Sequence, residues 1–164
     1  TIYRDILKKP LSEEEFASLC SKFKELVFNG VVSCEMVKGS REFMENHYSK
    51  YLLFVITATP HEEIVEILRR RNLLEYFKSV YGAPSSKKEA LKEILERFLL
   101  SQEEVVYVGD SLNDYNAAVA SGVRFMGRLH RENQSLLDFL KTKNTIEDLT
   151  ELAQKIEVYT KCTK

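Results

Sequence analysis

Short apolar runs rich in β-branched and aromatic residues indicate four strands along the chain. They lie at residues 51–56, 79–82, 105–108 and 123–127. Two of them, Tyr51 to Ile56 and Val105 to Val108, are uninterrupted by polar side chains. Continuous apolar runs of this kind are typical of strands that are buried on both faces of a sheet.

Apolar residues spaced three and four apart predict helices between and around these strands. The expected helices cover residues 12–28, 41–48, a stretch after Pro60, 87–100, 115–121, 135–141 and 145–156. The first begins with Ser12 and three glutamates, a capping pattern, and Asn29-Gly30 is expected to end it. Strands that alternate with helices predict βαβ units, a parallel sheet and an α/β fold.

Composition narrows the class of protein. The chain has 164 residues, 44% of them hydrophobic and 30% charged, which fits one globular domain with at most a small appendage. Its 24 basic and 25 acidic residues balance to a net charge of −1, so we expect no nucleic-acid partner. No apolar run could span a bilayer. The three cysteines, Cys20, Cys34 and Cys162, match no metal spacing and predict reduced thiols in a cytoplasmic protein.

Polar clusters follow three of the predicted strands. They are Thr57-Ala58-Thr59, Ser86-Lys87-Lys88 and Gly109 to Asp114. Each alone has an ordinary explanation, since a threonine or aspartate after a strand often caps a helix, and a lysine at a helix start is usually solvated. In parallel sheets, however, ligands bind at the carboxyl ends of the strands, where all three clusters would meet.

The residue types in these clusters suit a phosphate and a hard cation. Asp110 and Asp114 straddle a strand-to-helix turn, and paired carboxylates there are predicted to bind Mg²⁺. Thr57 and Ala58, at a helix N-terminus, are predicted to bind phosphate through the hydroxyl and backbone N–H groups. Lys87 is predicted to neutralise phosphate charge, with Lys88 as the fallback.

These segments resemble three motifs of the haloacid dehalogenase (HAD) superfamily. Phe54-Val55-Ile56-Thr57 resembles the second motif, Gly82 to Lys87 the third, and Val105 to Asp114 the fourth, with its Gly-Asp-x-x-x-Asp pattern. The resemblance covers residues 38 to 130 and implies a Rossmann-like three-layer sandwich at 39–164, with residues 1–38 as a partial helical cap. It also implies a Mg²⁺-dependent phosphatase of a small phosphorylated metabolite that works through an aspartyl-phosphate.

The family's first motif, an apolar strand that ends in Asp-x-Asp, does not occur in this sequence. Asp5 and Asp138 lack both the strand and the second aspartate. We therefore expect that the chain starts after this segment and is inactive by itself. In the family, that strand lies between the second-motif and fourth-motif strands. Without it, the chain is expected to be marginal, or to gain a strand in a homodimer or strand-swapped assembly.

Other functions remain open at this point. A non-catalytic domain that binds a phosphorylated ligand or a protein is the main alternative, and a flavodoxin-like fold of unrelated function is another. Gly109-Asp110-Ser111-Leu112 also spells the motif of a serine esterase class. That class needs an Asp-x-x-His late in the chain, and none of the three histidines has aspartate three residues before it. The histidines are interpreted as solvated or capping residues.

Overall fold

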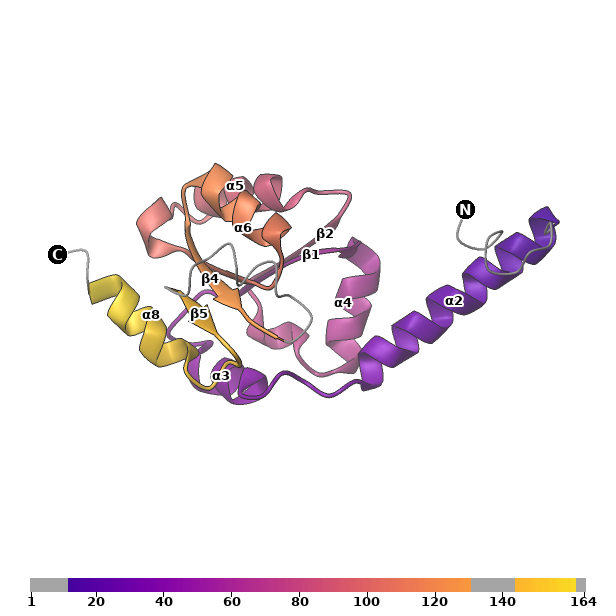
Figure 1. Cartoon of the computed structure of the whole chain (residues 1–164), viewed down its shortest axis with the longest axis horizontal. Helices are drawn as coiled ribbons and strands as arrows, with labels where there is room; N and C mark the ends of the chain where they lie inside the picture. The colour runs from indigo at the N-terminus through magenta and orange to yellow at the C-terminus, as the bar shows by residue number, and fades with distance from the viewer. Residues whose placement is uncertain (1–11, 131–143, 162–164) are drawn as a thin grey trace. The chain divides into compact units, whose positions relative to one another are not determined.

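The computed structural model describes residues 12–130 and 144–161 (Figure 1). The chain divides into two compact units, Thr1–Glu35 and Met36–Lys164, close to the boundary at residue 38 expected from the sequence. The described part of the first unit is one helix, α2 (Glu13–Ser33). Among the described residues, none of the helices has the length and apolar character that a membrane span requires.

Helix α2 starts as predicted but ends later. The hydroxyl of Ser12 accepts a hydrogen bond from the N–H of Glu15, whose carboxylate accepts one from the N–H of Ser12. The predicted stop at Asn29-Gly30 is wrong, because Gly30 keeps helical geometry and accepts a hydrogen bond from the N–H of Cys34 at 2.9 Å. A glycine ends a helix only where the chain turns left-handed, and here it does not.

The second unit alternates strands and helices in the expected order. Its elements are α3 (Ser40–His47), β1 (Phe54–Pro60), α4 (His61–Arg70), η1 (Leu74–Tyr76), β2 (Ser79–Ala83), α5 (Lys87–Arg97), η2 (Gln102–Glu104), β3 (Val106–Gly109), α6 (Leu112–Ser121), β4 (Arg124–Arg128), β5 (Thr145–Ile146) and α8 (Leu152–Lys161). This α/β architecture with parallel strands confirms the predicted fold class.

The strands form two separate parallel sheets rather than one. β1 pairs with β2, with Ile56 opposite Tyr81, and the register shifts beyond Ile56. β3 pairs with β4, and β4 pairs with β5. Within the described residues, no ladder joins β1 to β3. Among the residues that the structure describes, each of these two strands therefore has a hydrogen-bonded strand on one edge only.

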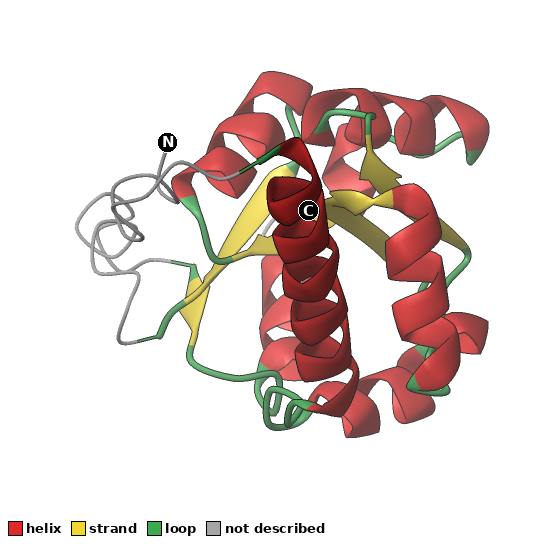
Figure 2. Ribbon diagram, turned by 90° about the vertical axis from the view of Figure 1, so that its right-hand side faces the viewer, coloured by secondary structure: helices red, strands yellow, loops and turns green. Residues whose placement is uncertain are grey.

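Helices lie on both sides of the strands (Figures 1 and 2), and alternate side chains of the strands pack against the two sides. On one face, Ile56 and Tyr107 pack with Phe125 against α5 and α6. On the other face, Val55 packs with residues of α3 and α4, and Val106 packs with residues of α3 and α8. Because side chains alternate between the two faces of a strand, α5, α6 and α3 pack against residues of both sheets. In the described structure, no backbone ladder joins one sheet to the other.

Three details of the predicted elements are corrected. β1 extends to Pro60, so Thr57 lies within the strand and not after it. α6 starts at Leu112, three residues earlier than predicted, because Ser111 caps it. The helix predicted at 145–156 begins as strand β5, since Ile146 is buried in the core beside Met126. The helix predicted at 135–141 lies outside the described residues.

Gly122 ends α6 in the left-handed conformation, at φ 70°. An alanine there would strain the backbone and bring its Cβ to 2.5 Å from the side chain of Gln102. We expect Gly122→Ala to lower the free energy of unfolding by about 1–2 kcal/mol in urea titrations. The neighbouring Ser121 is the control, because its buried hydroxyl has no hydrogen-bond partner within the described structure. Ser121→Ala should not destabilise the fold, and an equal loss in both variants would contradict this account.

Candidate functional site

One ion pair places the carboxyl ends of all the strands at the same edge. Lys87 opens α5, four residues after β2, and Asp114 lies in the first turn of α6, just after β3. The Nζ atom of Lys87 lies 2.6 Å from Oδ1 of Asp114. β2 and β3 therefore end at the same edge of the core, and so do their parallel partners. Ligands of parallel sheets bind at this edge.

The carboxylate of Asp114 is the centre of this cluster. Asp114 is only 5% exposed, and both of its oxygens accept hydrogen bonds. Oδ1 accepts from the Lys87 ammonium and, at 2.7 Å, from the hydroxyl of Tyr107. Oδ2 accepts from the N–H and the hydroxyl of Ser111, the residue that caps α6. The buried charge is thus paired and fully hydrogen-bonded, as a stable buried carboxylate must be.

Burial and hydrogen bonding have opposite effects on the pKa of Asp114. Burial raises the pKa of its carboxyl, but the hydrogen bonds from Lys87, Ser111 and Tyr107 outweigh burial and hold the pKa below its ordinary value of 3.8. Burial and the bond to Asp114 raise the pKa of the Tyr107 hydroxyl. At neutral pH the cluster therefore holds an ionised carboxylate, an ammonium and a protonated phenol.

Gly109 makes room for this arrangement. A Cβ atom added at Gly109 would lie 2.4 Å from the Cβ and 2.7 Å from the Cγ of Asp114. Any side chain at this position would push the aspartate away from Lys87 and Tyr107. The glycine at the end of β3 is needed for close approach, since its φ is not in the left-handed range.

Asp110 differs from Asp114 in its surroundings. Its side chain is 54% exposed, and its Oδ2 lies 3.8 Å from Nε2 of His130, at the end of β4. Asp110 thus presents a carboxylate to solvent beside the Lys87–Asp114 pair. An exposed carboxylate at the ends of strands suits Mg²⁺, which binds through one or two carboxylates and keeps several waters. Among residues 12–130 and 144–161, no three His, Cys, Asp or Glu side chains gather into a complete metal site.

Thr57 lies at the end of the regular pairing of β1. Its hydroxyl donates to the hydroxyl of Thr59 at 3.1 Å and accepts from the N–H of Thr59 at 3.2 Å. Ala58, which lies between them, is exposed. The next turn of chain, after Pro60, begins α4. Thr57 and Ala58 therefore lie near the carboxyl end of β1, although in the described structure neither forms a hydrogen bond with Asp114 or its partners.

The two lysines of the Ser86-Lys87-Lys88 cluster have different environments. Lys87 is half-buried and paired with Asp114, whereas Lys88 is exposed. This geometry favours Lys87, the first choice from the sequence. Two neighbours of the site were not identified from the sequence, Tyr107 and His130. Alternation along β3 would have placed Tyr107 on the same face as Val105, but its bond to Asp114 depends on the start of α6.

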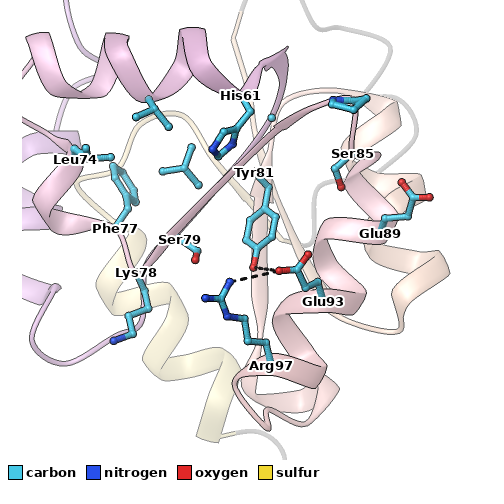
Figure 3. A pocket seen from close by; sticks show the side chains of 14 residues that line it. His61, Leu74, Phe77, Lys78, Ser79, Tyr81, Ser85, Glu89, Glu93 and Arg97 are labelled. Carbon is cyan, nitrogen blue, oxygen red and sulfur yellow. Dashed lines mark hydrogen bonds and ion pairs between the residues drawn. The ribbon is translucent and has the colours of Figure 1, made fainter.

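A cavity of about 860 Å³ lies elsewhere, along the outer edge of β2 (Figure 3). The hydroxyl of Tyr81 donates to Glu93 at 3.2 Å, and Arg97 lies 3.5 Å from the same carboxylate oxygen. Burial, and then the charge of Glu93, raises the pKa of Tyr81. None of the predicted site residues lines this cavity, and we interpret its polar cluster as a cover for the edge strand.

Comparison with known proteins agrees with this geometry. Residues 1–128 match a family described as haloacid dehalogenase-like hydrolase. A phosphoglycolate phosphatase of Vibrio cholerae is 30% identical over 95 residues, which are 55% of this chain and 42% of that protein. A phosphorylated carbohydrates phosphatase of Thermotoga maritima is 34% identical over 132 residues, 74% of this chain and 59% of its own length. The chain thus spans about half the length of these relatives.

Solved structures with this fold include two from the same group of proteins. A predicted phosphoglycolate phosphatase from Haemophilus somnus superposes with a TM-score of 0.76 over 92% of this chain and 71% of its own, at 20% identity. A haloacid dehalogenase-like family protein from Streptococcus pneumoniae gives a TM-score of 0.70 over 89% of this chain and 72% of its own, at 15% identity. At these identities the likeness establishes the fold alone.

The Lys87–Asp114 pair predicts a pH-dependent contribution to stability. Because the pKa of Asp114 is lowered in the folded state, the pair stabilises the fold above about pH 4, and this contribution is lost as the pH falls through the folded-state pKa. We expect Lys87→Met to lower the free energy of unfolding by about 2–3 kcal/mol at pH 7, where it leaves a buried carboxylate without its cation.

The loss should shrink as the pH falls below about 4, because the variant carboxyl, with its higher pKa, protonates first. Urea unfolding at pH 7 and pH 3 measures both values. Lys88→Met is the matched control, since Lys88 is exposed, and it should change stability by less than about 0.5 kcal/mol at either pH. Equal losses in the two variants, or a loss for Lys87→Met that does not depend on pH, would contradict the proposed pair.

Proposed function

Because the chain belongs to the haloacid dehalogenase-like hydrolases, we propose that it supplies the phosphate-binding and magnesium-binding part of a phosphatase. The observation that carries the proposal is the Lys87–Asp114 ion pair at the carboxyl edge of the strands. It joins the start of α5 to the start of α6 and fixes an ammonium group beside the exposed Asp110. A fixed cation next to a solvent-facing carboxylate suits a phosphate and its metal ion.

Each predicted residue has a role in this proposal. Lys87 neutralises charge on the phosphate, and Thr57 and Ala58 donate hydrogen bonds to its oxygens from the end of β1. Asp110 binds Mg²⁺, which would offset negative charge on the phosphate. Asp114 was predicted as a second metal ligand, but both of its oxygens already accept hydrogen bonds, which favours a supporting role in which it positions Lys87.

The reaction needs a nucleophile that the 164 residues do not supply in the family's Asp-x-Asp form. In the proposed reaction, an aspartate carboxylate attacks phosphorus, the alcohol of the substrate leaves, and water then hydrolyses the aspartyl-phosphate. The residues of this chain hold the phosphate in position and stabilise its charge. Activity therefore requires an added strand with such an aspartate from outside these 164 residues, because a second copy of the chain lacks the motif as well.

A small phosphorylated metabolite is the proposed substrate class. The relatives named above act, by their names, on phosphoglycolate and on phosphorylated carbohydrates. The residues of the site recognise the phosphate, so they do not distinguish these substrates. A cytoplasmic location remains a prediction from the cysteines, and Cys20 and Cys34 form no disulfide in the described structure.

The second candidate is a non-catalytic domain that binds a phosphorylated ligand or a protein. The lack of Asp-x-Asp within the chain favours it. The sequence that the gene encodes ahead of Thr1 separates the two candidates. An apolar run followed by Asp-x-Asp would support the phosphatase, and a coding sequence without one would support the binding domain.

The proposal predicts metal binding without turnover. We expect the folded chain with Mg²⁺ to hydrolyse no p-nitrophenyl phosphate above background, because it holds no positioned nucleophile. We expect Mg²⁺ to shift the backbone amide resonances of Gly109, Asp110 and Ser111, and Asp110→Ala to abolish these shifts. Asp148→Ala, which removes a carboxylate distant in sequence from the site, should leave them intact.

Two results would contradict this account. Turnover that disappears in Asp110→Ala would mean that the chain contains a nucleophile of its own. An absence of Mg²⁺-dependent shifts in a folded chain would remove Asp110 from the proposed metal site and favour the second candidate.

A further inference from the structure

Tyr107 donates to Asp114 from a strand of the core, whereas the other donors that the structure describes come from the starts of helices. Its hydroxyl lies 2.7 Å from Oδ1 of Asp114, an oxygen that it shares with the ammonium group of Lys87. Oδ2 accepts from the N–H and the hydroxyl of Ser111. Because a carboxylate has about four lone-pair sites, these donors occupy all of them and leave none for a metal ion.

The donors differ in what they fix. Both bonds from Ser111 stay within the first turn of α6, so they orient the carboxylate relative to its own helix only. Lys87 reaches Asp114 through a flexible four-carbon stem, and its ammonium group follows the oxygen wherever that oxygen lies. Tyr107 has a flat ring with two side-chain torsions, so it is a rigid donor from outside the helix.

The core holds the ring of Tyr107 in place. Tyr107 lies opposite Phe125 in the ladder between β3 and β4, and the two rings are in edge contact with centroids 6.3 Å apart. The ring also packs against the buried cluster that includes Leu91 of α5 and Ala118 of α6. Burial, and then the bond to Asp114, raises the pKa of the phenol, so it remains a protonated donor at neutral pH.

The place of the Lys87 ammonium group depends on the oxygen that Tyr107 holds. The Lys87 side chain is 19% exposed, and Asp114 is the hydrogen-bond partner that the described structure shows for its Nζ atom. An ammonium group has three N–H donors, so two of them remain for a ligand at the carboxyl edge of the strands. A shift of Oδ1 would therefore redirect the donors that face the ligand.

We propose that Tyr107 is a positioning residue of the phosphate site. Its hydroxyl holds Oδ1 of Asp114 so that the Lys87 ammonium group is fixed for phosphate binding. It also fills the lone pair through which Asp114 would otherwise bind Mg²⁺, which leaves Asp110 as the metal ligand of this segment. The inference rests on the proposed function for the identity of the ligand, but not for the hydrogen bonds that position Lys87.

The test compares variants that lack one hydroxyl. Tyr107→Phe removes the donor and keeps the packed ring, and Tyr107→Leu is a second variant that keeps only an apolar side chain. Tyr81→Phe is the matched control, since the buried Tyr81 also donates to a carboxylate, that of Glu93 at 3.2 Å, in the separate cavity along β2. Circular dichroism and amide spectra verify that each variant is folded.

The first measurement needs neither phosphate nor metal. Nitrogen relaxation of the side-chain ammonium groups by NMR gives an order parameter for each lysine. We expect the order parameter of Lys87 to exceed that of the exposed Lys88 in the unsubstituted chain and in Tyr81→Phe. It should fall toward that of Lys88 in both Tyr107 variants, because the carboxylate is then free to move.

The second measurement is the affinity for inorganic phosphate in the presence of Mg²⁺, followed through the amide resonances of Thr57 and Ala58. We expect Tyr107→Phe to weaken binding about fivefold, as for the loss of one hydrogen bond, and Tyr81→Phe to leave it unchanged.

Two results would overturn the proposal. One is an order parameter of Lys87 that does not change in the folded Tyr107 variants, and the other is equal phosphate affinity in Tyr107→Phe and Tyr81→Phe. An unsubstituted chain that binds no phosphate would instead contradict the proposed function, and the order parameter of Lys87 would still decide the role of Tyr107.

Discussion

A strand inside a parallel sheet must hydrogen-bond on both sides, and the rest of this structure depends on how far that requirement is met. β1 and β3 each have a ladder on one side only within the described residues. Their free edges face the same apolar cavity. Because no described strand joins β1 to β3, the strands form two small sheets, and helices that pack against both sheets connect them.

Helix α5 holds the two halves together at this gap. Its apolar side packs against Ile56 of β1 and Tyr107 of β3 in a single cluster, and its first residue, Lys87, forms the ion pair with Asp114. The same contacts that bridge the sheets therefore position the ammonium group of the candidate site. Stability and function are coupled here, because a change that separates the sheets would also move Lys87 away from Asp114.

Local sequence signals predicted the parts of this fold that depend on local physics. Apolar runs located the strands of the core, and the Gly-Asp-x-x-x-Asp segment located the turn after β3 together with Asp110 and Asp114. These signals failed where contacts with distant parts of the chain determine the local structure. Thr145 and Ile146 form a strand because β4 offers a free edge, and Gly30 continues a helix that its neighbour Asn29 suggested would end. The hydrogen bond from Tyr107 to Asp114 joins two elements, so no single pattern indicated it.

The sequence did not distinguish the roles of Asp110 and Asp114, whereas their surroundings in the structure differ. Asp110 and Asp114 have the same side chain, lie in the same segment after β3, and both were predicted to bind metal. Burial distinguishes them, because Asp114 is enclosed by hydrogen-bond donors whereas Asp110 faces solvent. A metal ion needs ligand oxygens with free lone pairs, which is a property of the folded environment and not of the motif.

The measurement that tests the divided sheet most directly is amide hydrogen exchange, followed residue by residue by NMR on the chain alone. In a parallel ladder, successive N–H groups of a strand point to alternate sides. The account predicts that amides of β1 and β3 that point toward the cavity between the two sheets exchange at rates close to those of loops, while those paired with β2 and β4 are strongly protected. Uniform strong protection along both strands would contradict it, because the cavity would then already hold a hydrogen-bonded strand.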